Sequence, residues 1–440
     1  MEEDKSVNFN AVTDAFNAYG EKFVREKNFD VRDFINFMEE KFTAAGYRTA
    51  PKIGEKLNLL IIHDAGIGDF VLQSGAIREI RRLYPAAHIT LVVNSGSVAL
   101  AECCPYVNEI ISLEPSQKHF DEMYKACLKT AQKIFKRGIN ICYAFIHRAW
   151  TPFLMYMSGA RIRIAHHVKD IDDAYLMSKK SPLLQSLKFF ATDFVPMFVY
   201  GNHMTDVFFS PLDYALKAPV ANRELELWYT PLDYFNAQNI LANVSTPRYA
   251  FSMGGNEFMK HYPPEKYAEL IKMILAAENV TFVIFGAGEP DLKSAQILRQ
   301  SLGEEIFSKH VIDLTNKINF RLGAAVTGLC DMYIGNDTSA MHIAAAAKLP
   351  VLTPNCFAVD LPQNKFDYVR FFSPYHVPSV VVQPKHALDE CKVAEPYDSM
   401  GCRVKTPHCI TQIEPQTLFQ GYKILKSRIA DKKSNPLFIC

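Results

Sequence analysis

The stretch GNDTSAMHIAAAAKLPVLTPNCF, residues 335–357, joins a strand end, a helix start and a second strand. The apolar run of residues 331–337 predicts a buried strand, and residues 350–354 predict the next one. Between them, Thr338 or Ser339 is expected to cap a helix whose run of alanines packs closely against its neighbours. A strand–helix–strand unit of this kind is typical of an α/β protein with a parallel sheet.

Four polar side chains fall on the first turn of that expected helix or on its approach: Asp337, Thr338, Ser339 and His342. A helix that begins just after a strand directs its free N–H groups and its positive dipole end towards the carboxyl edge of the sheet. This arrangement favours a phosphate group, so the four residues are candidates for phosphate binding. The alternative is that the hydroxyls only cap the helix and that the histidine is structural.

An equivalent unit opens the first α/β series. The apolar run of residues 57–62 predicts a strand buried on both faces, and residues 89–93 predict the next strand. Gly66 and Gly68 lie in the turn that follows the first strand, and Asp69 begins a helix. Two glycines are a weak nucleotide signal, because the third glycine of the dinucleotide fingerprint is missing. Asp69 is either a favourable helix cap or, where it faces a second domain, a functional carboxylate.

The second half of the chain repeats the scheme. Residues 249–253 and 280–285 predict two further strands, and each is followed by a glycine-containing loop and a helix. Lys260 follows the first of these strands, Glu289 follows the second, and residues 337–342 follow the third. Because the carboxyl ends of parallel strands meet at one edge of a sheet, these polar groups should converge there. Such convergence favours a ligand site over packing alone.

Basic residues of the first half are candidates for holding an anionic acceptor. Arg148 follows the expected strand INICYAFI, and Arg161 and Arg163 lie close together in GARIRIAHHVKD. Guanidinium groups at strand ends suit anions. His203 lies in an aromatic, irregular segment that suits a flap. The alternative is that these charges belong to solvated faces.

The domain organisation follows from length and pattern. At 440 residues the chain is too long for one core, so we expect two α/β domains, residues 56–220 and 221–408. Residues 1–55 carry apolar side chains at helical spacing and predict a helical extension that docks on the main body or on a partner. Residues 409–440 predict a C-terminal helix.

Composition restricts the partners and the compartment. A net charge of +1 excludes a global attraction to nucleic acid, and no apolar run reaches the roughly 18–20 residues that span a bilayer. The polar start MEEDKSVNFN indicates no signal peptide, so we expect ten reduced cysteines in a cytoplasmic protein that meets a membrane only peripherally. A zinc site stays open, although no CxxC pair supports it, because three cysteines accompany two histidines near the C-terminus: Cys391, Cys402, Cys409, His386 and His408.

Together these motifs resemble glycosyltransferase family 9, the heptosyltransferase-like enzymes of lipopolysaccharide core assembly. The resemblance rests on three segments in the family's order: HDAGIGDFVLQSGAIREIRRLYPAAHITLVV (63–93), KHYPPEKYAELI (260–271) and GNDTSAMHIAAAAKLPVL (335–352). It implies the GT-B fold, in which two Rossmann-like domains face each other across a cleft. The donor nucleotide would lie on the C-terminal domain and the acceptor on the N-terminal one.

The resemblance also implies a role for each candidate residue. Asp69 would be the general base, Lys260 would meet the donor's phosphates, and Glu289 would lie near the nucleoside ribose. The remaining donor-binding residues would be Asp337, Thr338, Ser339 and His342. The acceptor side would comprise Gly66, Gly68, Arg148, Arg161, Arg163 and His203.

The implied reaction is inverting transfer of a heptose or a related sugar to a bacterial lipopolysaccharide or other surface glycan. The donor would be a nucleotide-diphosphate sugar, ADP-heptose before others. GT-B enzymes commonly work without a metal, so no obligatory cofactor is expected. Two alternatives stay open: a nucleotide-sugar epimerase of the same fold, which needs no acceptor, and a non-catalytic nucleotide-sugar-binding scaffold in polysaccharide assembly.

Overall fold

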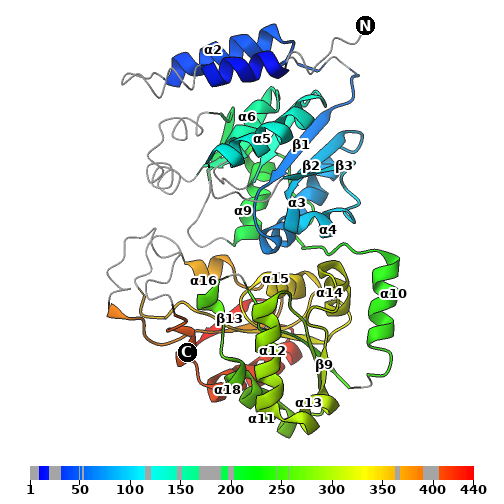
Figure 1. Ribbon diagram of the computed structural model, residues 1–440, viewed down its shortest axis with the longest axis vertical. Coiled ribbons are helices and arrows are strands. Elements are labelled where there is room, and N and C mark those ends of the chain that lie inside the picture. The colour runs from blue at the N-terminus through cyan, green and yellow to red at the C-terminus, as the bar shows by residue number, and fades with distance from the viewer. Residues whose placement is uncertain are drawn as a thin grey trace. The chain divides into compact units, whose positions relative to one another are not determined.

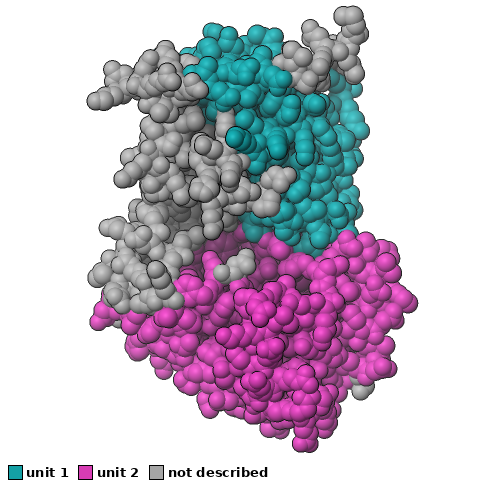
Figure 2. All heavy atoms as spheres, in the orientation of Figure 1, with its two compact units in different colours: residues 1–66, 76–198, 207–223 teal, residues 67–75, 199–206, 224–440 magenta. Residues whose placement is uncertain are grey.

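The chain folds into two compact units, which Figure 2 colours separately. The structure is a computed structural model that describes residues 9–18, 31–48, 50–51, 54–113, 120–145, 151–167, 190–196, 203–244, 246–255, 257–361, 367–389 and 406–440. The first unit comprises residues 1–66, 76–198 and 207–223, and the second comprises residues 67–75, 199–206 and 224–440. The N-terminal extension is therefore part of the first unit, and the C-terminal helix is part of the second.

The first unit is built on a parallel sheet of six strands in the order β3-β2-β1-β4-β5-β6. Its strands are β1 (Asn58–His63), β2 (His88–Asn94), β3 (Glu109–Leu113), β4 (Ile141–Ala144), β5 (Ile162–His167) and β6 (Asp193–Pro196). Its helices are α4 (Val98–Ala101), α5 (Phe120–Phe135) and α6 (Thr151–Met157), while α3 (Ile67–Leu83) and α9 (Met204–Ser210) continue from one unit into the other. The strand β1 pairs with β2 and β4, which explains its uninterrupted apolar run.

The N-terminal extension packs on this first unit. Residues 9–18 are helical, and α2 (Val31–Ala44) follows; both turn aromatic side chains into the core. The Phe16 ring meets Phe34 and Phe153 edge-on, at centroid distances of 5.5 and 5.3 Å. The helical spacing of the apolar residues therefore reflects docking on the main body.

The second unit contains a parallel sheet of seven strands in the order β13-β12-β11-β10-β7-β8-β9. Its strands are β7 (Arg248–Ser252), β8 (Thr281–Ile284), β9 (Val311–Asp313), β10 (Met332–Gly335), β11 (Val351–Pro354), β12 (Ser379–Val382) and β13 (Pro436–Ile439). Its helices, several of which are labelled in Figure 1, are α10 (Pro231–Ile240), α11 (Pro264–Ala277), α12 (Glu289–Leu302), α13 (Glu304–His310), α14 (Phe320–Thr327), α15 (Ser339–Ala346), α16 (Tyr368–Phe371) and α18 (Pro415–Ala430).

Both sheets reverse their strand order beside their first strand. In the second unit, β7 lies between β8 and β10, so the connections on its two sides run in opposite directions. Open α/β sheets bind ligands outside the carboxyl ends of the strands at such a switch point. The loops that follow β7 and β10 are therefore where a ligand is expected. These are the loops that carry Lys260 and the 336–342 segment.

The α/β fold class expected from the sequence is confirmed, and the expected strands agree with the observed ones to within two residues. The run at 331–337, for example, contains β10, and the run at 350–354 contains β11. Within the described part of the chain, no helix combines the length and the apolar character that a membrane crossing requires.

Candidate functional site

The helix α15 begins at the carboxyl end of β10 with free backbone N–H groups. Thr338 is its N-cap residue, as the sequence predicted, but the Thr338 side chain makes no capping hydrogen bond. Among the described residues, the amides of Ser339 and Ala340 have no hydrogen-bond acceptor. Two unsatisfied donors at the positive end of a helix dipole form a site for an anion. The Thr338 hydroxyl interacts with Tyr333 instead of capping the helix.

Asn336 joins this helix start to the loop after β7, and sequence reasoning missed it. Its fully buried side chain donates from Nδ2 to the carbonyl oxygen of Met253 at 2.5 Å and to that of Gly254 at 3.3 Å. Its Oδ1 accepts from the Tyr267 hydroxyl at 2.8 Å and from the Tyr262 N–H at 3.4 Å. A buried amide with both ends satisfied holds loops rigidly. The available signal was an asparagine directly after a buried strand.

The loop after β7 approaches α15 closely because it contains two consecutive glycines, Gly254 and Gly255. A Cβ placed on Gly255, whose φ is +146°, would lie 2.8 Å from Thr338 Cγ2. A Cβ placed on Gly254 would collide with the Asp291 carboxylate, as would one placed on Gly286. Gly254, Gly255 and Gly286 leave no room for a side chain, so the close approach of these loops requires glycine at these positions. The two loops at the switch point are thus packed directly on each other.

Lys260 stands in the same place, at the end of the short 3₁₀ turn η4 (Phe258–Lys260). Its Nζ lies 3.0 Å from Glu257 Oε2 and 3.9 Å from Asp337 Oδ2. The charges of Asp337 and Glu257 raise the pKa of the Lys260 ammonium, although burial opposes them. Asn355 Nδ2 donates to Asp337 Oδ2 at 3.2 Å and fixes this carboxylate. The predicted convergence of Lys260 and Asp337 is therefore observed.

His342 is buried on α15 as a neutral imidazole. Burial, with smaller effects from the charges of His203 and Lys260, lowers its pKa to about 3. Its buried Nδ1 has no hydrogen-bond partner among the described residues. A Cβ placed on Gly68 would lie 3.0 Å from His342 Cδ2 and 3.4 Å from Ser339 Cα. Gly68, a residue of the second unit, thus packs on the first turn of α15, and Asp69 is the next residue.

The first turn of α12 carries two acidic residues, of which the sequence singled out only Glu289, and the role of Glu289 near the ribose stays a prediction. Glu289 is exposed as the first residue of α12. Asp291 instead lies against the glycine loops and accepts a 2.7 Å hydrogen bond from the Ala287 N–H. Burial raises the pKa of the Asp291 carboxyl. The signal for Asp291 was a pair of glycines that follow neighbouring strands and face one acidic residue.

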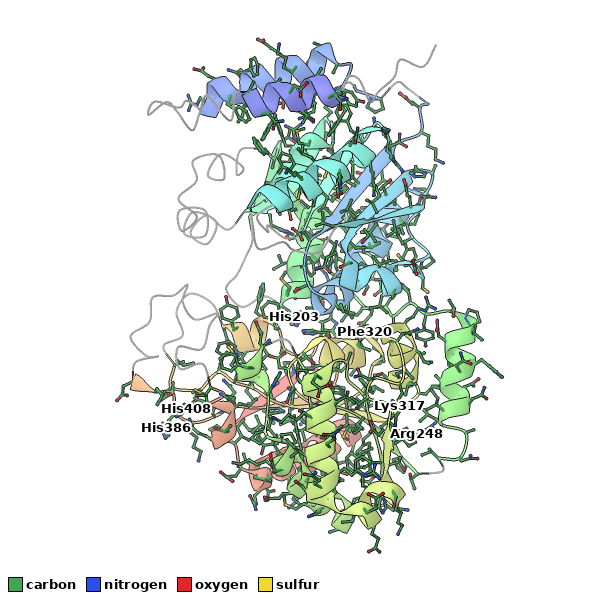
Figure 3. All side chains as sticks on the ribbon, viewed as in Figure 1. His203, Arg248, Lys317, Phe320, His386 and His408 are labelled. Carbon is green, nitrogen blue, oxygen red and sulfur yellow. The ribbon has the colours of Figure 1, made fainter. Side chains whose placement is uncertain are left out.

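His203 has no group left for an acceptor, which contradicts its expected role. Its Nε2 donates to the Ser373 carbonyl oxygen at 2.6 Å, and its Nδ1 accepts from the Thr205 N–H at 3.0 Å. Burial lowers its pKa to about 4, and the ring lies against Tyr375 with a centroid distance of 4.7 Å. His203, labelled in Figure 3, therefore ties the 203–206 segment to the loop around Ser373.

Arg161 and Arg163 lie at the amino end of β5, which contradicts the expectation of an acceptor site at a carboxyl strand end. Arg163 is buried, donates to the carbonyl oxygens of Phe190 and Ala160 at 2.7 and 2.8 Å, and lies 3.6 Å from Glu39 of α2. Arg161 is exposed. The Arg163 guanidinium thus holds the N-terminal extension, a role that no local sequence pattern reveals.

The expected acceptor roles of Gly66 and Arg148 stay predictions. The carbonyl oxygen of Gly66 lies 3.2 Å from His63 Nε2, within the first unit, and its acceptor role stays a prediction. Arg148 lies outside the described residues.

The described residues contain no group of three side chains that could hold a metal ion. His386 and His408 are labelled in Figure 3. The His386 ring lies 3.3 Å from Asp360, and His408 Nδ1 lies 3.6 Å from Cys409 Sγ. Cys391 and Cys402, the other expected ligands, lie outside the described residues. None of the eight described cysteines forms a disulfide bond.

Comparisons with known proteins show a similarity to one family of enzymes. Residues 201–354 match the model of glycosyltransferase family 9 (heptosyltransferase). A lipooligosaccharide heptosyltransferase 2 from Haemophilus influenzae is 23% identical over 311 residues, which are 67% of this chain and 82% of that protein.

Solved structures agree on the fold. The glycosyl transferase family 9 protein of Veillonella parvula superimposes with a TM-score of 0.63 at 19% identity, covering 84% of this chain and 97% of that one. The E. coli ADP-heptose lps heptosyltransferase II gives a TM-score of 0.60 at 16% identity, covering 85% and 100%. The chain therefore resembles glycosyltransferase family 9, whose model its residues 201–354 match, and it is a glycosyltransferase with the GT-B fold.

Proposed function

We propose that this enzyme transfers a heptose or a related sugar, with inversion, from a nucleotide-diphosphate donor to a bacterial lipopolysaccharide or other surface glycan. The observation that carries the proposal is the anion site at the switch point. There Lys260, the free amides of Ser339 and Ala340, and a glycine loop meet. ADP-heptose is the proposed donor, because the E. coli relative is named for it.

The anion site suits the departing nucleoside diphosphate. As the bond between the anomeric carbon and the diphosphate oxygen breaks, negative charge grows on that oxygen. The Lys260 ammonium and the oriented amides of α15 would stabilise this charge without reorganisation. His342 can add a hydrogen bond from its unpartnered Nδ1 when that nitrogen carries the ring proton. These groups supply positive charge themselves, so we propose that no metal is obligatory and that turnover persists in EDTA.

Asp69 is the proposed general base. The acceptor hydroxyl attacks the anomeric carbon, a new carbon–oxygen bond forms, and the hydroxyl proton passes to the Asp69 carboxylate. Support comes from the adjacent Gly68, which packs on Ser339 and His342 of the donor helix. The base would thus lie one residue from the donor-binding turn.

The experiment that tests the function is a turnover assay with ADP-heptose and with GDP- and UDP-sugars, using truncated lipopolysaccharide cores as acceptors. We expect glycosidic transfer and equimolar nucleoside diphosphate with one donor. Lys260→Ala should raise the donor KM and lower kcat, since the ammonium meets phosphate in the ground state and in the transition state. Lys266→Ala is the matched control, because Lys266 pairs with Glu414 away from Asp337. Absence of both transfer and nucleotide release with every donor would refute the proposal.

Two other functions give different outcomes in the same assay. An epimerase would convert the donor sugar without acceptor, and a scaffold would bind nucleotide without turnover. The proposed acceptor is an anionic glycolipid at the inner face of the cytoplasmic membrane, met peripherally; co-sedimentation with vesicles that contain lipopolysaccharide core tests this location.

A further inference from the structure

We infer that Glu257 competes with the donor's diphosphate for Lys260. In the free enzyme the Glu257 carboxylate neutralises the Lys260 ammonium, and when the donor binds Glu257 moves away from the ammonium. The inference rests on the proposed donor site and names a residue that sets the affinity of that site. Its basis is the ion pair between Lys260 Nζ and Glu257 Oε2, at 3.0 Å, in the place where the phosphate is expected.

The two carboxylates beside Lys260 differ in how firmly they are held. Asp337 has a side chain that is 10% exposed, and Asn355 donates to its carboxylate at 3.2 Å. Glu257 has a side chain that is 51% exposed, and its carboxylate makes no capping hydrogen bond to the turn η4 that it precedes. The Lys260 ammonium lies 3.0 Å from Glu257 Oε2 and 3.9 Å from Asp337 Oδ2, so Glu257 makes the shorter of the two contacts. Glu257 is therefore the carboxylate that can leave.

The negative charge around Lys260 requires one of the two carboxylates, Glu257 or Asp337, to leave when the diphosphate binds. An ammonium between two carboxylates already carries a local excess of one negative charge, and a diphosphate adds at least one more. Three anionic groups around one ammonium repel each other strongly in a partly buried site. Release of Glu257 to solvent costs little, because an ion pair with an exposed partner is weak. Diphosphate binding should therefore replace Glu257 and keep Asp337.

The exchange also affects product release. After sugar transfer, the nucleoside diphosphate stays on Lys260 until it dissociates, and the returning Glu257 competes with it. Removal of the Glu257 charge should therefore tighten both donor and product. A residue that contacted the sugar or an ion favourably would have the opposite effect on affinity, so the sign of the change decides between these roles.

The test measures the Kd of ADP and of inorganic pyrophosphate by calorimetry on the full-length chain, with GDP and UDP run alongside. Glu257→Gln keeps the shape and removes the charge. Glu265→Gln is the control: this exposed residue of the first turn of α11 changes the net charge equally but has no ion pair with Lys260 among the described residues. Lys260→Ala and the double variant complete a mutant cycle.

We expect Glu257→Gln to lower the Kd of ADP and pyrophosphate by about three- to fivefold, and Glu265→Gln to change it less than about twofold. In the Lys260→Ala background the effect of Glu257→Gln should fall below about twofold, because most of it acts through the ammonium. Unchanged or weaker binding by Glu257→Gln overturns the inference while leaving the donor site intact. A wild-type protein that binds none of the probes overturns the inference and the proposed donor site together.

Discussion

The Tyr267 hydroxyl donates a 2.8 Å hydrogen bond to Oδ1 of Asn336, and this bond ties the helix α11 to the loop that follows β10. Burial raises the pKa of the Tyr267 phenol well above its usual value, so it stays a donor. The other end of the Asn336 amide holds the carbonyl oxygens of Met253 and Gly254. One side chain thus positions the loops on both sides of the switch point in the second unit.

Asn336→Ala should therefore affect stability and donor binding together. The change leaves the Tyr267 hydroxyl and the Met253 carbonyl oxygen unsatisfied, which costs about 2–4 kcal/mol. We expect Tm to fall by about 5–10 °C and the Kd of ADP to rise.

Thermal melts and calorimetry check both effects. Asn319→Ala removes the N-cap of α14 and serves as the control, since it should cost about 1 kcal/mol of stability and leave ADP binding unchanged. Normal ADP affinity in folded Asn336→Ala would show that the amide has no positioning role.

Asp69→Asn should keep the fold and the donor affinity but lower kcat by roughly 10²–10⁴, the usual contribution of a positioned base. The amide and the carboxylate have nearly the same size, so packing survives. Steady-state kinetics and ADP titration on the same preparation make the comparison. If Asp69 is only a helix cap, the variant loses at most about 1 kcal/mol of stability and turns over almost normally.

Arg163→Gln should lower stability without raising the acceptor KM. Burial lowers the pKa of the Arg163 guanidinium to about 10, yet it remains charged at neutral pH and donates to Phe190 and Ala160. Its loss leaves the Phe190 carbonyl oxygen without this donor, while Ala160 keeps its hydrogen bond from Arg48, and should cost about 1–3 kcal/mol.

The matched variant is Arg161→Gln, because Arg161 is exposed at the same strand end. Its Tm should stay within about 1 °C of the wild type, since exposed substitutions cost little. An acceptor KM that rises several-fold in Arg163→Gln with no loss of Tm would restore the acceptor role predicted from the sequence.

Acidification should destabilise the second unit between about pH 6.5 and pH 4. The folded state holds His203 and His342 with pKa values of about 4 and about 3, below the value of about 6.5 in an unfolded chain. The unfolded state therefore binds more protons in this window, so stability is fully present above pH 6.5 and is lost as the pH falls.

At pH 5.5 the protonation linked to each of these two histidines should lower the free energy of unfolding by about 1 kcal/mol. Melts at pH 7.5 and pH 5.5 measure the loss, and His203→Gln should show a smaller difference between the two. An identical pH dependence in wild type and His203→Gln would exclude His203 as a source.

The sequence alone determined the α/β class, the strands beside the switch points and the loops that carry the site, but it missed strands such as β13, which lies within the expected C-terminal helix. These follow from local physics: an unbroken apolar run such as the one in β1 fits only a strand covered on both faces, and glycines beside a strand end mark a turn. The convergence of Lys260 with Asp337 was also predictable, because carboxyl ends of parallel strands share one edge.

Only the tertiary structure decided which polar groups are free. His203 and Arg163 looked like ligands of an anion, but their hydrogen bonds go to Ser373 and Phe190, which are distant in sequence. Asn336 and Asp291 looked unremarkable, yet they hold the switch-point loops. A side chain's availability depends on partners brought close by folding, and local sequence carries no information about those partners.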